Sequence, residues 1–354
     1  MKLFSCHACH ALLFFESVSC VRCGHTLAYL PDAGLMSAMN ALPDGGVWEA
    51  QAPAVRGQRF RLCRNSTEFG VCNWAVPIDD PDPLCRACRL NAIIPNLSEP
   101  GAREAWARIE VAKHRLVYSL LSLGLPVETR SAPEGPGLAF EFMRDTEDEK
   151  VWTGHNDGVI TINIAEADDP FREKTRVQLG EPYRTLLGHF RHEIGHYYWD
   201  RLVAGTPMLA RFREVFGDES PSYADAMSVH YENGPRADWQ ARYVSAYASA
   251  HPWEDWAETW AHYLHMVDTL ETARAFGLSL KPSPVAEAKP PPATAPGWAD
   301  FRSFDDLWSG WVALTAALNS LNRSMGLPDS YPFVLSPVAL DKLRFVHEVV
   351  QDSG

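Results

Sequence analysis

The sequence predicts an α+β protein with a cysteine-rich N-terminal region and a mostly helical second region that contains a small β-sheet. Two observations lead to this prediction. All eight cysteines of the 354-residue chain occur between Cys6 and Cys88, and such crowding is typical of a separate small module. After them, two strand patterns precede a run of helical patterns, which is an order typical of α+β folds. We therefore expect domains over residues 1–95 and 96–354.

The first four cysteines form two Cys-x-x-Cys pairs, "CHAC" and "CVRC" (Cys6, Cys9, Cys20 and Cys23). Each pair can occupy a tight turn that directs two thiolates at one ion, and two such turns complete the four-sulfur shell of zinc. The spacing predicts a zinc ribbon with a structural zinc ion. Three nearby histidines, His7, His10 and His25, are alternative donors that the sequence leaves open.

The other four cysteines are Cys63, Cys72 and the "CRAC" pair of Cys85 and Cys88. One Cys-x-x-Cys knuckle with two more widely spaced thiolates predicts a second structural zinc site. Structural zinc supplies folding energy to a segment too short to bury a good core. We expect the zinc-ribbon region to act first as a scaffold and second as a surface for a protein partner.

Charge and hydropathy limit the location and the partners of the chain. The N-terminus, "MKLFSCHACH", places cysteines where a signal peptide needs an apolar stretch, and we find no run of eighteen apolar residues. We therefore expect a cytoplasmic protein without a membrane partner. The formal net charge is −13, and residues 1–98 are charge-balanced, so the rest of the chain is acidic. An acidic body disfavours nucleic acid as a partner.

Four segments organise the second region. Ser98 is the expected cap of a long helix that runs to Gly124, with Ile109 and Leu116 on its apolar face. Strands are predicted within residues 137–143 and 157–168, the second because isoleucines alternate with polar residues. The segment 281–297 has six prolines and is expected to be a surface loop. Helical patterning then resumes.

The segment "HFRHEIGHYYWD" lies in a predicted helix and contains the pattern H-E-x-x-H. On a helix, His192 and His196 face the same way and can hold one zinc ion, with Glu193 beside them. Zinc lowers the pKa of a bound water, and a neighbouring glutamate can take its proton as general base. His189, one turn earlier, is expected to pack nearby rather than bind the metal.

A catalytic zinc needs a third protein ligand. The pattern that adds a third histidine six residues later is excluded, because Leu202 occupies that position. The best donors follow in "HPWEDWAETWAHYLH", where Pro252 suits the first turn of a helix and Glu254, Glu258 and His262 stack at successive i+4 positions. Glu254 is the preferred third ligand, and Glu258 is the alternative.

These segments resemble the gluzincin class of zincin metallopeptidases, and "YASAHPWEDWAETW" is similar to the active-site segment of peptidases of the anthrax lethal factor type. The resemblance implies that Glu254 is a zinc ligand and that Glu258 orients a zinc-bound histidine. It also implies that Tyr247 donates a hydrogen bond to the oxyanion formed during catalysis. In zincins an upstream strand pairs with the substrate. "DGVITINI" is the candidate here, with a strand inside the sheet as the alternative.

Together, the cysteines and the two helical segments resemble a bacterial family of zinc-binding metallopeptidases with an N-terminal zinc-ribbon domain. The resemblance covers essentially the whole chain. It implies a zincin-like peptidase domain that acts on a peptide or protein, with one catalytic zinc and two structural zinc ions. Two other functions stay open: an adaptor that binds a partner through its ribbons around an inactive zincin core, and a protease recruited to proteins bound to nucleic acid.

Overall fold

The computed structural model describes residues 2–43, 45–131, 135–146, 148, 150–179, 185–280 and 303–353; the side chains of 175–179 are left out of the description. The predicted proline-rich loop 281–297 lies outside these residues. The chain divides into two compact units, Met1–Phe190 and Arg191–Gly354. Small sheets and many helices confirm the predicted α+β class. No helix in the described part of the chain is long and apolar enough to cross a membrane.

The cysteine-rich start of the first unit is built from short strands. A two-stranded hairpin precedes a five-stranded antiparallel sheet with strands in sequence order. Residue Tyr29 also bridges to Trp74 in parallel, so the first strand of this sheet approaches the last. The elements are β1 (Phe4–Ser5), β2 (Leu12–Leu13), β3 (Thr26–Leu30), β4 (Leu35–Ala41), β5 (Trp48–Ala50), η1 (Pro53–Val55), β6 (Arg59–Leu62), α1 (Arg64–Thr67), β7 (Ala75–Pro77) and η2 (Cys88–Leu90).

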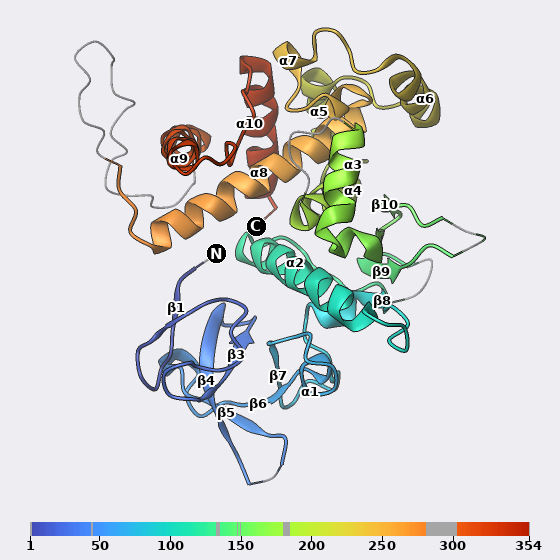
Figure 1. Ribbon diagram of the computed structural model, residues 1–354. Helices are drawn as coiled ribbons and strands as arrows, with labels where there is room; N and C mark the ends of the chain where they lie inside the picture. The colour runs from blue at the N-terminus through green and yellow to red at the C-terminus, as the bar shows by residue number, and fades with distance from the viewer. Residues whose placement is uncertain are drawn as a thin grey trace. The chain divides into compact units, whose positions relative to one another are not determined.

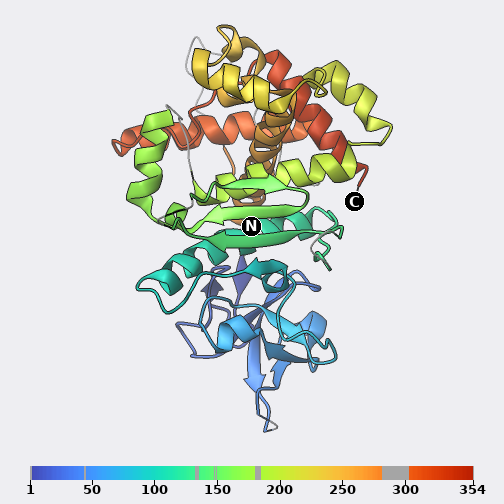
Figure 2. The same cartoon turned by 90° about the vertical axis from the view of Figure 1, so that its right-hand side faces the viewer.

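The second half of the first unit contains a long helix and a mixed sheet, whose strands lie side by side in Figure 2. The sheet has the order β10-β11-β9-β8, with β9 parallel to both β11 and β8 and β10 antiparallel to β11. The elements are β8 (Asn91–Ile93), α2 (Ala102–Ser122), β9 (Ala139–Met143), β10 (Gly154–Asn156), β11 (Val159–Asn163), η3 (Ile164–Ala167), α3 (Asp169–Leu179) and the start of α4 (Leu186–Leu202).

One expectation about this half is wrong in detail. The cap of α2 is Gly101, at φ 76°, and not Ser98, which hydrogen-bonds to Asn96 in the preceding turn. Glycine adopts this left-handed conformation without strain, and the chain can therefore turn into the helix there. The predicted substrate strand is β11, which has a partner strand on each side. This pairing agrees with the alternative that the strand lies inside the sheet.

The second unit is helical, as Figure 1 shows for α5 to α10. Its core is aromatic: Trp256 and Trp260 of α8 are fully buried, and Trp256 packs edge-on against Phe212 and Phe345. Helix α8 packs against both α9 and α10. The elements are the rest of α4, α5 (Met208–Phe216), α6 (Tyr223–Asn233), α7 (Trp239–Arg242), η4 (Tyr247–Ser249), α8 (Pro252–Ala275), α9 (Phe304–Ser324) and α10 (Pro337–Gln351).

Candidate zinc sites and active site

Helices α4 and α8 approach each other closely because Gly195, inside the H-E-x-x-H segment, has no side chain. A Cβ atom at this position would lie 3.0 Å from the Cα atom of Ala257 and 3.2 Å from the Cβ atom of Trp260. The indole of Trp256 also donates a hydrogen bond of 2.8 Å to the carbonyl of Gly195. This close contact brings the histidines of α4 to the first turns of α8.

The start of α8 is fixed by its own sequence. His251 is the N-cap, and its Nδ1 atom accepts a hydrogen bond from the main-chain N–H of Trp253 at 3.1 Å. Pro252 follows at the first helical position, where its missing N–H is not needed. Glu254 then lies in the first turn and is only 1% exposed. A carboxylate buried this deeply needs a cationic or hydrogen-bonding partner.

The three predicted catalytic ligands converge. One ligand atom from each of His192, His196 and Glu254 lies within 4.8 Å of the others. The Nε2 atom of His192 is 3.0 Å from one oxygen of Glu254, and Nε2 of His196 is 3.6 Å from the other. Ligand bonds of about 2.0–2.2 Å in a tetrahedral zinc site would place such atoms about 3.4 Å apart. The donor set and its spacing therefore fit zinc.

The hydrogen bonds of His192 define which nitrogen faces the ligand cluster. Its Nδ1 atom lies 2.8 Å from Oε1 of Glu258, and a carboxylate accepts, so Nδ1 carries the hydrogen. In the neutral ring, Nε2 then has a lone pair directed at the carboxylate of Glu254. Two acceptors 3.0 Å apart need a proton or a metal ion between them. Glu258 is thus in place to orient the histidine.

Ser245 extends this chain of contacts and was not indicated by the sequence. Its hydroxyl donates a 2.6 Å hydrogen bond to the second oxygen of Glu258. The same Oγ atom accepts the main-chain N–H of Ala248, in the turn η4 that precedes α8. The carboxylate of Glu258 is therefore held at both oxygens, by Ser245 and by His192.

The charges of the site favour an ionised ligand and a protonatable neighbour. Burial alone would raise the pKa of Glu254, but the imidazoles of His196 and His192 bring it well below its ordinary value. Burial raises the pKa of Glu193, and the same two imidazoles only partly oppose this. Glu193 is 9% exposed and lies between the two histidines in sequence. The raised pKa of Glu193, in contrast to the lowered pKa of Glu254, suits a group that accepts and donates a proton.

Two tyrosines stand next to the ligand cluster. The ring of Tyr247, the residue proposed from resemblance, lies 5.9 Å from the ring of His192. Tyr223, at the start of α6, was not predicted, and its hydroxyl donates a 2.7 Å hydrogen bond to Oε1 of Glu254. Burial and then the charge of Glu254 raise the pKa of both hydroxyls, so both stay protonated donors near neutral pH.

Two other histidines of these helices lie outside the ligand cluster. His189 is 3.5 Å from the carboxylate of Glu166. His262, at the next i+4 position after Glu258, contacts the hydroxyl of Tyr331 at 2.7 Å through its Nδ1 atom. Neither belongs to a group of potential metal ligands among the described residues. Helical spacing alone therefore does not separate ligands from core histidines.

The sulfurs of Cys6, Cys9, Cys20 and Cys23 lie within 4.8 Å of one another. Two matching turns bring them together. The N–H of His10 bonds to the carbonyl of Cys6 at 2.8 Å, and the N–H of Gly24 bonds to the carbonyl of Cys20 at 2.8 Å. His10 and Gly24 both have positive φ, at 59° and 75°. These turns form a four-sulfur cluster without the nearby histidines, and its chemistry fits zinc.

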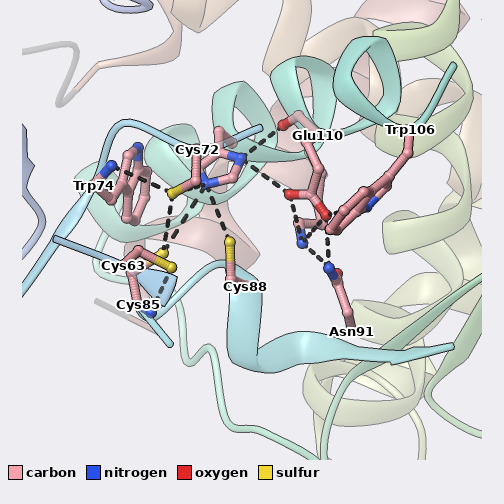
Figure 3. A network of polar contacts seen from close by, with 10 residues as sticks. Cys63, Cys72, Trp74, Cys85, Cys88, Asn91, Trp106 and Glu110 are labelled. Atoms are coloured by element: carbon pink, nitrogen blue, oxygen red, sulfur yellow. Dashed lines mark hydrogen bonds and ion pairs between the residues drawn. The ribbon is translucent and has the colours of Figure 1, made fainter. Parts of the chain in front are cut away.

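The sulfurs of Cys63, Cys72, Cys85 and Cys88 form a second cluster, all within 4.8 Å of one another and all buried (Figure 3). The Sγ atom of Cys63 accepts the N–H of Cys85, and that of Cys72 accepts the N–H of Trp74, each at 3.3 Å. The sulfurs of Cys72 and Cys85 are 3.8 Å apart, which is about the edge of a tetrahedral four-sulfur zinc site.

Comparison with known families covers nearly the whole chain. Residues 102–349 match the family described as "Putative zinc-binding metallo-peptidase", and residues 3–99 match a zinc-ribbon domain. The chain belongs to this metallopeptidase family. The match confirms the resemblance seen in the sequence, and the zinc-ribbon match supports zinc binding at the cysteine clusters. A boundary near residue 96 is our proposal for the domain division, and it lies a few residues before the end of the zinc-ribbon match at residue 99.

Relatives of similar length occur in mycobacteria. Uncharacterized proteins of Mycobacterium bovis and of two strains of Mycobacterium tuberculosis are each 42% identical to this chain over 353 residues. The alignment covers 99% of this chain and 96% of each relative. No solved structure matches the protein significantly.

Proposed function

We propose that the protein is a zinc-dependent metallopeptidase that hydrolyses peptide bonds in a peptide or protein substrate. The observation that carries the proposal is the arrangement of His192 between two carboxylates. The Nδ1 atom of His192 contacts the carboxylate of Glu258, whereas its Nε2 atom faces Glu254 at 3.0 Å. This is the contact pattern of a metal-ligating histidine whose other nitrogen donates to a carboxylate. His192, His196 and Glu254 are the proposed ligands of a gluzincin-like site.

When bound, zinc would supply Lewis-acid activation of water and of the substrate carbonyl. Glu193 is the proposed general base. It follows His192 directly in the chain, and burial raises its pKa. A carboxylate with a raised pKa accepts a proton at neutral pH and returns it more readily than an ordinary glutamate. We assign to it the transfer of a proton from the attacking water to the leaving amine.

Tyr247 is the proposed donor to the oxyanion, because it is the partly buried hydroxyl beside His192 that is not hydrogen-bonded to the ligand Glu254. A hydrogen bond aimed at the developing charge typically contributes a factor of about 10²–10³ to kcat. Tyr223 is the competing donor, but its hydroxyl is engaged with Glu254 at 2.7 Å. We assign Tyr223 to holding the ligand carboxylate and Tyr247 to the reaction.

A second candidate function is binding of a protein partner through the first cysteine cluster. Two apolar side chains there are strongly exposed: Phe14 is 67% and Val21 is 97% exposed. An adaptor with an inactive core predicts that Glu193→Gln leaves the biological activity unchanged. A substitution of Phe14 by serine would then abolish that activity. A peptidase recruited by its ribbons needs both residues.

The function is tested by digesting a mixed-peptide library with zinc-loaded wild type and with Glu193→Gln, and by reading new termini by mass spectrometry. We expect cleavage products that appear only with the wild type and disappear when a chelator removes zinc. Glu141→Gln in β9 is a control, because this glutamate lies in the other unit and has no assigned role. Products equally abundant with Glu193→Gln would contradict the proposed base.

A further inference from the structure

The second cysteine cluster has a fifth donor, His114, which lies on α2 and not in the zinc-ribbon segment. Its imidazole is buried, 4% exposed. Its Nε2 atom lies close to three of the four sulfurs, at 3.3 Å from Cys72, 3.8 Å from Cys88 and 4.0 Å from Cys85. An ordinary hydrogen bond would need only one sulfur. Three similar distances instead place the nitrogen over a face formed by three sulfurs.

The other nitrogen of this ring determines what Nε2 can do. Nδ1 of His114 is 2.7 Å from the main-chain oxygen of Glu110. A carbonyl oxygen only accepts, so Nδ1 carries the hydrogen, and in the neutral ring Nε2 presents a lone pair. A lone pair directed at sulfur atoms is unfavourable unless a proton or a metal ion lies between them. Histidines that bind metals commonly donate their second N–H to a carbonyl or a carboxylate in this way.

The distances agree with this reading. Zinc bonds of about 2.3 Å to sulfur and about 2.0 Å to nitrogen give a tetrahedral edge of about 3.5 Å between the two atoms. The three measured contacts lie on either side of that value. We propose that His114 is a metal ligand of the second zinc centre, together with Cys72, Cys85 and Cys88, in the place that the sequence assigns to Cys63.

The surroundings of His114 hold the ring in position. Glu110, one turn earlier, is fully buried and contacts Nδ1 with its carboxylate at 3.2 Å. The same carboxylate receives hydrogen bonds from Trp106 at 2.9 Å and from Asn91 at 2.6 Å, and pairs with the buried Lys113 at 3.0 Å (Figure 3). This buried network restrains the ring. It orients the imidazole toward the sulfurs.

Charge also favours a histidine ligand in this centre. Four thiolates around Zn²⁺ carry a net charge of −2, whereas three thiolates and a neutral imidazole carry −1. The cluster is buried, and a buried net charge is costly. In this shell Cys63 is not a ligand, and its Sγ atom accepts the N–H of Cys85 at 3.3 Å. The proposed shell around the metal ion therefore carries the smaller net charge.

The consequence is that zinc would join two segments of the first unit. Three ligands come from the stretch matched to the zinc ribbon, and the fourth comes from α2, in the stretch matched to the metallopeptidase family. Losing this metal should then loosen α2 as well as the ribbon. This inference does not depend on the proposed peptidase activity, because it concerns a structural centre.

The test is a ¹H–¹¹³Cd correlation spectrum of the full-length protein loaded with ¹¹³Cd. Each cadmium ion correlates with the protons of its own ligands. We expect one sulfur-rich resonance that couples to the β-protons of four cysteines of the first cluster. A second resonance should couple to β-protons of three cysteines and to the ring protons of His114. Coupling of the second resonance to four cysteines and to no imidazole would overturn the proposal.

Two matched cysteine substitutions and one substitution of His114 sharpen this test. Cys63→Ser should keep the second resonance and its coupling to His114, whereas Cys72→Ser should lose it. The resonance of the first cluster serves as an internal control for folding in both variants. His114→Cys should shift the second resonance to the position of a four-sulfur site. Loss of the second resonance in Cys63→Ser, with the first resonance intact, would also contradict the assignment.

Discussion

The Oε1 atom of Glu258 lies 2.8 Å from Nδ1 of His192, and the other oxygen of this carboxylate accepts a 2.6 Å hydrogen bond from Ser245. Glu258 is thus held from two sides while it holds the imidazole. This relationship supports our proposal that Glu254, rather than Glu258, is the third ligand. Glu254 faces the nitrogens that remain for the metal, at 3.0 and 3.6 Å, and Glu258 faces the opposite nitrogen of His192.

Removing either support of His192 should weaken zinc binding without unfolding the protein. We expect Glu258→Gln and Ser245→Ala to lower zinc affinity by about 10–100-fold, because such outer contacts fix the orientation and basicity of the ligand. Competition with a chromophoric chelator measures the affinity. Ser249→Ala is a matched control in the same turn, since its hydroxyl bonds to the Ala246 carbonyl and not to Glu258. An equal loss in Ser249→Ala would argue against this role of Ser245.

Substitutions of Tyr247 and Tyr223 should differ in their effects on kcat and on zinc binding. Tyr247→Phe is expected to lower kcat by about 10²–10³-fold while zinc content and KM stay nearly unchanged, because the lost hydrogen bond forms only in the transition state. Tyr223→Phe should mainly weaken zinc binding, since its hydroxyl contacts the ligand Glu254. Steady-state kinetics on a peptide found in the library digestion measures the first effect, and competition with a chromophoric chelator measures the second. The opposite pattern would exchange the roles assigned to the two residues.

The close approach of α4 and α8 predicts a strong effect at Gly195. In Gly195→Ala the new methyl group meets the Cα atom of Ala257 at 3.0 Å and the Cβ atom of Trp260 at 3.2 Å. We expect a loss of about 1–3 kcal/mol in the free energy of unfolding, as is typical of overpacking. Denaturant unfolding of the zinc-free protein measures this without a contribution from the metal. A variant as stable as the wild type would show that the helices can separate at little cost.

Regular spacing explains why much of the site could be predicted. The i+4 positions of His192 and His196 on α4, and of Glu254 and Glu258 on α8, follow from helical geometry alone. Ser245 and Tyr223 could not be found this way. Each contacts an acid of α8 from another part of the chain, and such a contact depends on the tertiary structure. No local pattern in a sequence reports such contacts.

Helix α2 has a pattern of polar residues in its sequence that also indicates buried contacts. Its apolar period was predicted correctly, with Ile109 and Leu116 buried. Three polar residues, Glu110, Lys113 and His114, interrupt the apolar face at i, i+3 and i+4 spacing, and all three are buried. Buried polar residues need partners. The expectation that Ser98 caps this helix was wrong because the choice among neighbouring cap residues depends on the hydrogen bonds of the preceding turn.

The central claim is that His192, His196 and Glu254 form a metal site in addition to the two cysteine clusters, and the zinc content of the purified protein tests it most directly. We predict about three zinc ions per chain in the wild type, and about two in His192→Ala and in Glu254→Ala, with both variants still folded. About two zinc ions per chain in the wild type, unchanged by His192→Ala, would contradict the account.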